Sequence, residues 1–210
     1  MGYRKYKWVF AKEMMTQSGV SQNDMQENSL QDNEMKLIKP CMQYQASYLA
    51  YITELADEER YPFPLDFDCD DFAAMLQKNQ DFADGVNLPQ GYVASETYWL
   101  VDGVDLIGVA NLRLTLNDNI RHCGGHIGMG IRPSYRGKGL GAKLMAQTIA
   151  LAKGKGMNEL HIHCHKHNHA SAKMIIANGG ILHSEIEIVT DNGNQSNNAV
   201  AIVQRYRVCK

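Results

Sequence analysis

The chain has 210 residues, of which 44% are hydrophobic, so it is long enough for one sizeable core or for one domain with a tail. Its formal net charge of −2 excludes the strongly basic composition that would indicate binding to nucleic acid or to an anionic membrane surface. Five scattered cysteines without a C-x-x-C pair favour reduced thiols in the cytoplasm over a disulfide framework. No apolar run approaches the roughly 20 residues of a membrane helix.

The first 34 residues differ in composition from the rest. Between Thr16 and Glu34 the sequence is rich in Gln, Asn and Ser and has few apolar side chains, so burial there cannot offset the entropy lost on ordering. We expect a flexible polar leader over residues 1–34 and one folded domain over residues 35–210. The sequence leaves open whether translation starts at Met1 or at Met35.

Hydrophobic periodicity and turn signals predict the elements of the folded domain. Helical spacing of apolar residues indicates helices, and apolar runs bounded by glycines or prolines indicate strands. In chain order the predicted elements are a strand at 35–40, helices at 44–59 and 71–80, strands at 95–102, 105–116 and 126–132, a helix at 141–153, a strand at 160–165, a helix at 170–178, and strands at 181–189 and 199–208. This mixed order is typical of an α/β domain in which helices cover one sheet.

The stretch RPSYRGKGLGAKL, at 132–144, lies between a predicted strand and a predicted helix. A helix N-terminus presents unpaired backbone N–H groups and a partial positive charge. Glycines let such a backbone approach an anion closely, and Arg136 and Lys138 add positive charge. The chemistry therefore favours a pyrophosphate site over a simple turn.

The spacing of the glycines excludes two common nucleotide motifs. A Walker A loop needs Ser or Thr after its lysine, but Gly139 follows Lys138. The dinucleotide fingerprint G-x-G-x-x-G fails because the glycines fall at 137, 139 and 141. The remaining match, Arg-x-x-Gly-x-Gly at 136–141, resembles the acyl-CoA motif of the GNAT superfamily of N-acyltransferases, and of its small bacterial members with undefined acceptors. The resemblance covers most of residues 35–210 and is strongest over 125–180, where strand, loop, helix, strand and NHAS follow in that order.

This resemblance implies the GNAT acyl-CoA N-acyltransferase fold, a mixed, mostly antiparallel twisted sheet with helices on both faces. Its two central parallel strands, at 126–132 and 160–165, would splay apart around the pantetheine of acetyl-CoA. The backbone of Met129, Gly130 and Ile131 would pair with the pantetheine and polarise the thioester carbonyl. The pyrophosphate would bind the N–H groups of the loop, which are those of Arg136, Gly137, Lys138, Gly139, Leu140, Gly141 and Ala142.

The implied reaction moves an acetyl group directly from acetyl-CoA to a primary amine of a small molecule or peptide. The amine must lose a proton, the oxyanion must be stabilised, and the leaving thiolate must gain a proton. His126 is one candidate base, because the ordinary pKa of an imidazole is about 6.5. Glu96 is another, because it could reach the same cleft through water from a neighbouring strand.

The general acid is the point at which the sequence departs from the family. Many members carry an Asn and, seven residues later, a Tyr that protonates the CoA thiolate. Here Asn168 is followed at that position by Ile175, which cannot donate a proton. Water, Ser171 and Tyr206 remain as candidates, and Asn168 is expected to contact CoA or to cap the following helix. This departure also favours an alternative function, a catalytically weak CoA-binding or regulatory module.

The run HIHCHKHNH at 161–169 introduces the alternative of a metal site. His161, His163 and His165 share one face of a predicted strand, and imidazoles that close together could bind zinc or nickel. Three adjacent histidines on one strand do not form the usual tetrahedral ligand set, so we expect no metal.

Residues 57–71 carry seven carboxylates against one arginine. Such a segment is most often a solvated surface. In the GNAT fold, however, the segment after the first helix commonly lines the acceptor side, where Asp66, Asp68 and Asp70 would attract a cationic amine such as a polyamine, an aminoglycoside or a lysine side chain. The sequence identifies neither the acceptor nor the oligomeric state, for which a homodimer is one option.

Overall fold

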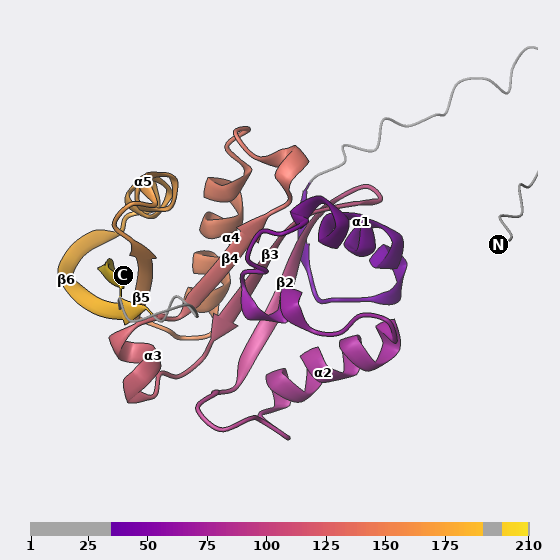
Figure 1. Ribbon diagram of the computed structural model, residues 1–210, viewed down its shortest axis with the longest axis horizontal. Helices are drawn as coiled ribbons and strands as arrows, with labels where there is room; N and C mark the ends of the chain where they lie inside the picture. Colours follow the sequence, from indigo (N-terminus) through magenta and orange to yellow (C-terminus); the bar gives the residue numbers. More distant parts are fainter. Residues whose placement is uncertain (1–34, 191–198, 210) are drawn as a thin grey trace, which may run out of the picture. The chain divides into compact units, whose positions relative to one another are not determined.

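A computed structural model describes the chain over residues 35–190 and 199–209. The predicted leader at 1–34 and the polar loop between the last two strands lie outside the described residues. The elements in chain order are β1 (Lys36–Ile38), the 3-10 helix η1 (Met42–Tyr44), α1 (Gln45–Leu55), η2 (Phe63–Asp66), α2 (Phe72–Asp84), β2 (Ser95–Asp102), β3 (Asp105–Arg113), α3 (Asp118–His122), β4 (Ile127–Ile131), η3 (Pro133–Tyr135), α4 (Leu140–Gly154), β5 (Glu159–His165), α5 (His169–Ala177), β6 (Ile181–Thr190) and β7 (Ala199–Cys209) (Figure 1). Of the described helices, none is both long and apolar enough to span a membrane.

Each predicted helix and strand is present, and the largest differences lie at helix ends. The first helix is shorter than predicted and ends at Leu55, because Ala56 adopts a positive φ of 47°. The second helix is longer and ends where Gly85 adopts the left-handed conformation (φ 71°). The short helix α3 was not predicted. It is only five residues long and begins at a cap in which the Asn117 side chain accepts the Ile120 N–H (2.9 Å).

The strands form two sheets, which corrects the prediction of one sheet from the order of elements. Their strand orders are β1-β2-β3-β4 and β5-β7-β6, and the ladders in both are antiparallel. β4 and β5 meet beside the bridge between Gly125 and Ile162, where the His126 N–H donates to the His161 carbonyl (2.6 Å). In the described part of the chain these two strands share no ladder, so they separate as the family resemblance implied.

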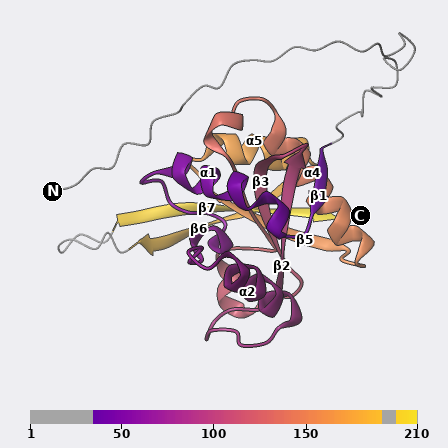
Figure 2. The ribbon, with the colours of Figure 1, turned by 90° about the vertical axis from the view of Figure 1, so that its right-hand side faces the viewer.

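Helices cover both faces of the four-stranded sheet (Figure 1). On β2, Trp99 and Val101 belong to the core shared with α1 and α2, whereas Tyr98 and Leu100 pack on the side of α4. This alternation follows from the period of two along a strand. β6 and β7 lie side by side in a long hairpin (Figure 2). The packing of α4 places its N-terminus beside the end of β4, which is where the candidate site lies.

Candidate active site

Two cavities beside β4 share part of their lining. The first, about 490 Å³, reaches the glycine loop at the start of α4 and is here called the loop cavity. The second, about 320 Å³, contains His163 and His165 and is called the histidine cavity. The residues that line both cavities, here called the junction, are Glu59, Tyr61, Met129, Asn168 and Ser171. A ligand in one cavity can therefore meet a ligand in the other at the junction.

The glycine loop ends in an uncapped helix N-terminus. Gly139 is the N-cap of α4, and no side chain of the described residues caps this end of the helix. Gly137 and Gly139 both have a φ of 75°, a left-handed conformation that favours glycine. A Cβ atom at either position would meet no atom within 4 Å. The loop thus has open space beside backbone N–H groups, which is the geometry of an anion site.

The structure brings most of the predicted cofactor-binding residues together. Those that line the loop cavity are Met129, Gly130, Ile131, Arg136, Gly137, Gly139, Leu140, Gly141, Ala142 and Asn168. Lys138 is not among them, because its Nζ donates to the Ser134 carbonyl (3.0 Å). The Arg136 guanidinium is paired with Glu58 (2.8 Å) and donates to the Ile131 carbonyl (2.9 Å). Backbone groups, more than these two side chains, are therefore available to an anion.

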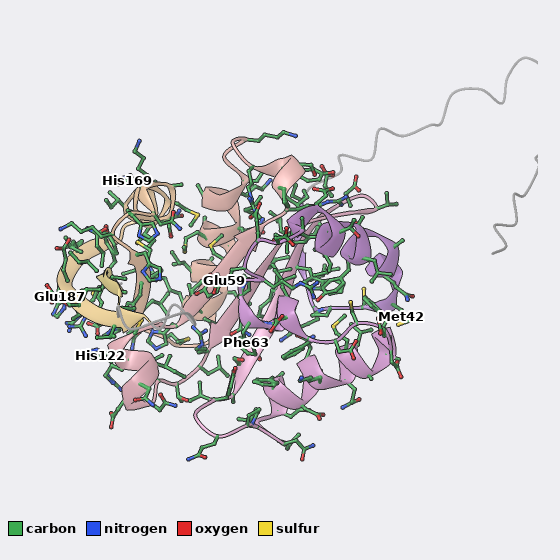
Figure 3. All side chains as sticks on the ribbon, viewed as in Figure 1. Met42, Glu59, Phe63, His122, His169 and Glu187 are labelled. Atoms are coloured by element: carbon green, nitrogen blue, oxygen red, sulfur yellow. The ribbon has the colours of Figure 1, made fainter. Side chains whose placement is uncertain are left out.

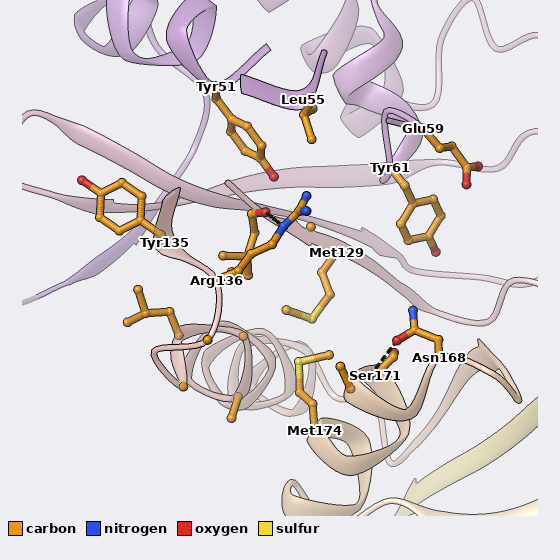
Figure 4. A pocket seen from close by; sticks show the side chains of 18 residues that line it. Tyr51, Leu55, Glu59, Tyr61, Met129, Tyr135, Arg136, Asn168, Ser171 and Met174 are labelled. Carbon is orange, nitrogen blue, oxygen red and sulfur yellow. Dashed lines mark hydrogen bonds between the residues drawn. The ribbon is translucent and has the colours of Figure 1, made fainter. Parts of the chain in front are cut away.

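The junction is assembled from three separate segments (Figure 4). Asn168 caps α5, since its side-chain oxygen accepts the Ser171 N–H (3.0 Å). Tyr61 comes from the segment between α1 and η2 and lies against β4. A Cβ atom on Gly128 would come within 2.8 Å of the Tyr61 Oη, and one on Gly130 would collide with the Tyr61 carbonyl. The two glycines of β4 therefore allow Tyr61 to approach the strand.

Tyr51 is a residue of the loop cavity that the sequence did not single out. Its side chain is fully buried, yet its hydroxyl has no hydrogen-bond partner within the described residues. Burial raises the pKa of Tyr51, so the hydroxyl remains protonated at neutral pH. A buried donor without a partner costs stability, and in the loop cavity it is available to a polar atom of a ligand.

The histidine cavity is lined mainly by uncharged groups. The His163 Nδ1 accepts the Gly124 N–H (3.1 Å), while its Nε2 is buried without a partner in the described part of the chain. Burial and the neighbouring His161 lower the pKa of His163 to about 4, so the ring is neutral at pH 7. Among the residues lining the two cavities, Glu59 supplies the one carboxylate. Figure 3 shows Glu59 toward the middle of the molecule.

Both predicted bases lie outside the two cavities, which corrects the expectation that they share the cleft. The His126 Nδ1 accepts the His161 N–H (2.9 Å), and burial together with His161 lowers the pKa of His126 to about 4. For Glu96, burial raises the pKa, but hydrogen bonds from Tyr98 and Lys155 outweigh it and hold the pKa below its usual range. Both groups are therefore weak bases with structural partners.

The two predicted acids differ in position. Ser171 lines both cavities. Tyr206 is buried in the core and donates to the Gln204 side chain (2.8 Å), so it is not part of either cavity lining. Ile175 is also fully buried in that core.

The histidine run has other partners. The His161 Nε2 pairs with Glu159 (2.8 Å), and the His163 Nδ1 accepts from Gly124. In the described ranges, no group of three or more His, Cys, Asp or Glu side chains is arranged to hold a metal ion. The run thus contributes to the contact between β4 and β5 and to the wall of the histidine cavity.

Solved structures with the same fold include several that are described as acetyltransferases. A GNAT-family acetyltransferase from Streptococcus pneumoniae has a TM-score of 0.57 and 16% identity, over 84% of this chain and 100% of that chain. A putative acetyltransferase from Salmonella typhimurium with its cofactor acetyl-CoA has a TM-score of 0.53 and 14% identity, over 84% and 94%. A spermidine N-acetyltransferase chimera from Vibrio cholerae and hSSAT has a TM-score of 0.55 and 15% identity, over 83% and 95%. At these identities the likenesses show the fold.

A search of curated proteins gives no match to the chain. A comparison with family models assigns the family from the sequence itself. The model described as the acetyltransferase (GNAT) family matches residues 49–177. This range contains the glycine loop, the junction and both strands that flank the cavities. Because the match spans more than half of the sequence, the chain belongs to the GNAT family of acetyltransferases.

Proposed function

We propose that this acetyltransferase moves the acetyl group of acetyl-CoA directly to a primary amine of a small molecule or peptide. The observation that carries the proposal is the open N-terminus of α4, whose glycine loop lines a cavity that continues through the junction into a second one. A structural relative from Salmonella typhimurium was solved with acetyl-CoA. The free cysteines of this chain suit a reducing compartment, so we place it in the cytoplasm.

Acetyl-CoA fits the loop cavity at several points. Backbone N–H groups between Gly137 and Gly141 would hold the pyrophosphate, since those of Arg136 and Ala142 already donate to the Pro133 and Gly139 carbonyls (both 3.1 Å). The backbone of Met129, Gly130 and Ile131 would pair with the pantetheine, and the unpartnered Tyr51 hydroxyl would donate to one of its polar atoms. Asn168 would contact the pantetheine part of acetyl-CoA and at the same time cap α5. This orientation places the acetyl group at the junction and leaves the histidine cavity for the acceptor.

The acceptor in this proposal is a cationic amine. A third cavity, about 470 Å³ and here called the acidic cavity, opens beside the junction and is lined by Asp57, Glu58, Glu59 and Asp66, with Arg60 as its basic residue. The Glu58 carboxylate is paired with Arg136 (2.8 Å), so the attraction of a cation falls mainly to Asp57, Glu59 and Asp66. Carboxylates around a concave surface attract cations and raise their local concentration. The fold is shared with a spermidine N-acetyltransferase chimera, which is an enzyme for such an amine.

Glu59 is the group placed to assist the amine. Its carboxylate belongs to the junction and to the acidic cavity. We assign it the binding of the incoming ammonium and, through water, the acceptance of the proton that the amine loses. Ser171 lies on the opposite side of the junction, on α5, where its hydroxyl can contact the acyl group.

The direct test incubates the full chain with acetyl-CoA and a panel containing a polyamine, lysine, a peptide with a free N-terminus and a neutral amine. Release of free CoA thiol and the mass of the acetylated amine are measured together. We expect acetylation of at least one cationic amine above the reaction without protein. Binding of acetyl-CoA without any acetylated product would contradict the proposal and support the CoA-binding module instead.

A further inference from the structure

The proposed reaction, on which this inference depends, ends with a thiolate that needs a proton. When the tetrahedral intermediate collapses, the bond between carbon and sulfur breaks and sulfur keeps the electron pair. A positioned acid that protonates sulfur in the same step accelerates this collapse. In many GNAT enzymes this acid is the tyrosine seven residues after the Asn, and here that residue is the buried Ile175.

The acid must lie at the junction, because the acetyl group must be reachable from both cavities. Three junction residues carry a group able to exchange a proton, namely Glu59, Tyr61 and Ser171. Glu59 is already required for the ammonium. An aliphatic hydroxyl such as that of Ser171 is a much poorer acid than a phenol, whose ordinary pKa is about 10. Tyr61 is therefore the best acid available there.

The surroundings of Tyr61 suit this role. Its hydroxyl lies close to Gly128 of β4, the chain neighbour of Met129, which lines both cavities. Tyr61 and Asn168 face one another from opposite walls of the cavity, with Met129 to one side of them (Figure 4). Although 41% of the Tyr61 surface is exposed, desolvation raises the pKa of Tyr61 and the nearby Arg113 only partly opposes that effect, so the hydroxyl is protonated at neutral pH and has a proton to donate.

We propose that the Tyr61 hydroxyl donates its proton to the sulfur of CoA as the thioester bond breaks. The products are CoA thiol, the N-acetyl amine and a Tyr61 phenolate. The incoming ammonium loses two protons over one turnover: one returns to the Tyr61 phenolate through the water beside Glu59, and the other is released to solvent, so protons and electrons balance. A tyrosine on the segment between α1 and η2 thus replaces the tyrosine that is missing from α5.

The first test measures binding and needs no acceptor. CoA and desulfo-CoA, which lacks the sulfur, are titrated into wild type, Tyr61→Phe and Tyr92→Phe by calorimetry. Tyr92 is an exposed tyrosine that makes edge-on ring contacts with Phe63 and Phe82 and belongs to neither cavity lining, so Tyr92→Phe is the matched control. We expect wild type and Tyr92→Phe to bind CoA about 5-fold more tightly than desulfo-CoA, as one hydrogen bond to sulfur would give. Tyr61→Phe should abolish that preference and retain the affinity for desulfo-CoA, which also reports an intact fold.

The second test measures turnover with the best amine of the panel. Tyr61→Phe should lower kcat about 100-fold and leave the KM for acetyl-CoA nearly unchanged, since the acid acts when the bond breaks. An undiminished sulfur preference or an undiminished kcat in Tyr61→Phe would overturn the assignment of Tyr61 while leaving acetyl transfer established. If wild type acetylates no amine, the proposed function fails, and the binding test alone decides whether Tyr61 contacts the sulfur.

Discussion

The loop cavity and the histidine cavity are built in different ways. The anion end of the loop cavity comes from one short stretch, Arg136, Gly137 and Gly139 to Ala142, which would act mainly through backbone groups. The histidine cavity takes side chains from the segment after α1, from the turn before β4, and from β5 and β7. Binding of acetyl-CoA in the loop cavity should therefore depend on small residues and backbone conformation. Binding of the amine should depend on charge and protonation. Three predictions test this difference, from the largest expected effect to the smallest.

Acid should destabilise the fold through two histidines at the contact between β4 and β5, of which His163 lines the histidine cavity and His126 lies outside it. The pKa values of His126 and His163 are about 4 in the folded chain, below the ordinary value of about 6.5. Between these values the unfolded chain binds more protons, so stability is present above pH 6.5 and is lost as the pH falls toward 4. Near pH 4, the preferential protonation of each histidine in the unfolded chain should lower the unfolding free energy by about 3 kcal/mol. Urea denaturation at pH 7 and at pH 4.5 measures the loss.

The matched variants for this prediction are His126→Asn and His169→Asn. The asparagine introduced by His126→Asn retains an oxygen that can accept the His161 N–H, but it cannot be protonated, so stability should fall less steeply with acid. His169 is an exposed histidine at the start of α5, and His169→Asn should follow the wild type. Equal slopes in all three proteins would contradict the role of His126.

A methyl group in the glycine loop should weaken the binding of acetyl-CoA. Gly139 and Gly156 lie at opposite ends of α4, both have positive φ, and a Cβ atom at either would meet no atom within 4 Å. Replacement of either by Ala should cost about 1–2 kcal/mol of stability through backbone strain. Only Gly139→Ala places its methyl group where we propose that the pyrophosphate binds, and it should raise the Kd for acetyl-CoA about 10- to 100-fold.

Calorimetry with the two glycine variants and wild type measures this effect. Gly156→Ala is the control for strain, because it shares the backbone conformation and lies outside both cavities. A similar loss of affinity in both variants would mean that strain, and not contact with the anion, explains the result.

Neutralising a carboxylate of the acidic cavity should raise the KM for a cationic amine. Asp66 lines this cavity, whereas Asp68 and Asp70 do not, and the Asp68 carboxylate instead accepts the Asp70 N–H (3.0 Å). The structure thereby narrows the group of three that the sequence suggested. Asp66→Asn should raise the KM about 5-fold at low salt, while Asp68→Asn should have a much smaller effect. Equal KM values for the two variants would show that the cavity does not bind the amine.

The elements and the glycine loop could be predicted because their signals are local in the sequence. The alternation that sends Trp99 and Leu100 to opposite faces of β2 is readable from a few neighbouring residues. The loop is likewise specified by the spacing of its glycines, since neighbours along the chain remain neighbours in a turn.

The side chains of the junction could not be predicted in this way. Glu96 was a reasonable base by sequence, but its position on β2 brings it to Lys155, which is 59 residues away. Tyr61 lies in an acidic segment, and no motif around YPFP indicates that this tyrosine contributes to a site. Its position at the site depends on Gly128 and Gly130, two glycines of a strand far along the chain. These glycines could have suggested that another segment packs closely on the strand, but they do not identify that segment.

The sequence by itself determined the family, the α/β elements and the anion loop with its open helix N-terminus. The tertiary structure decided how the strands divide into two sheets, which histidines are buried at the contact between them, and which side chains meet at the junction. The physical reason is the range of the interactions. Backbone conformation and hydrophobic period act over a few residues, whereas burial, hydrogen-bond partners and pKa values depend on contacts between segments that only folding brings together.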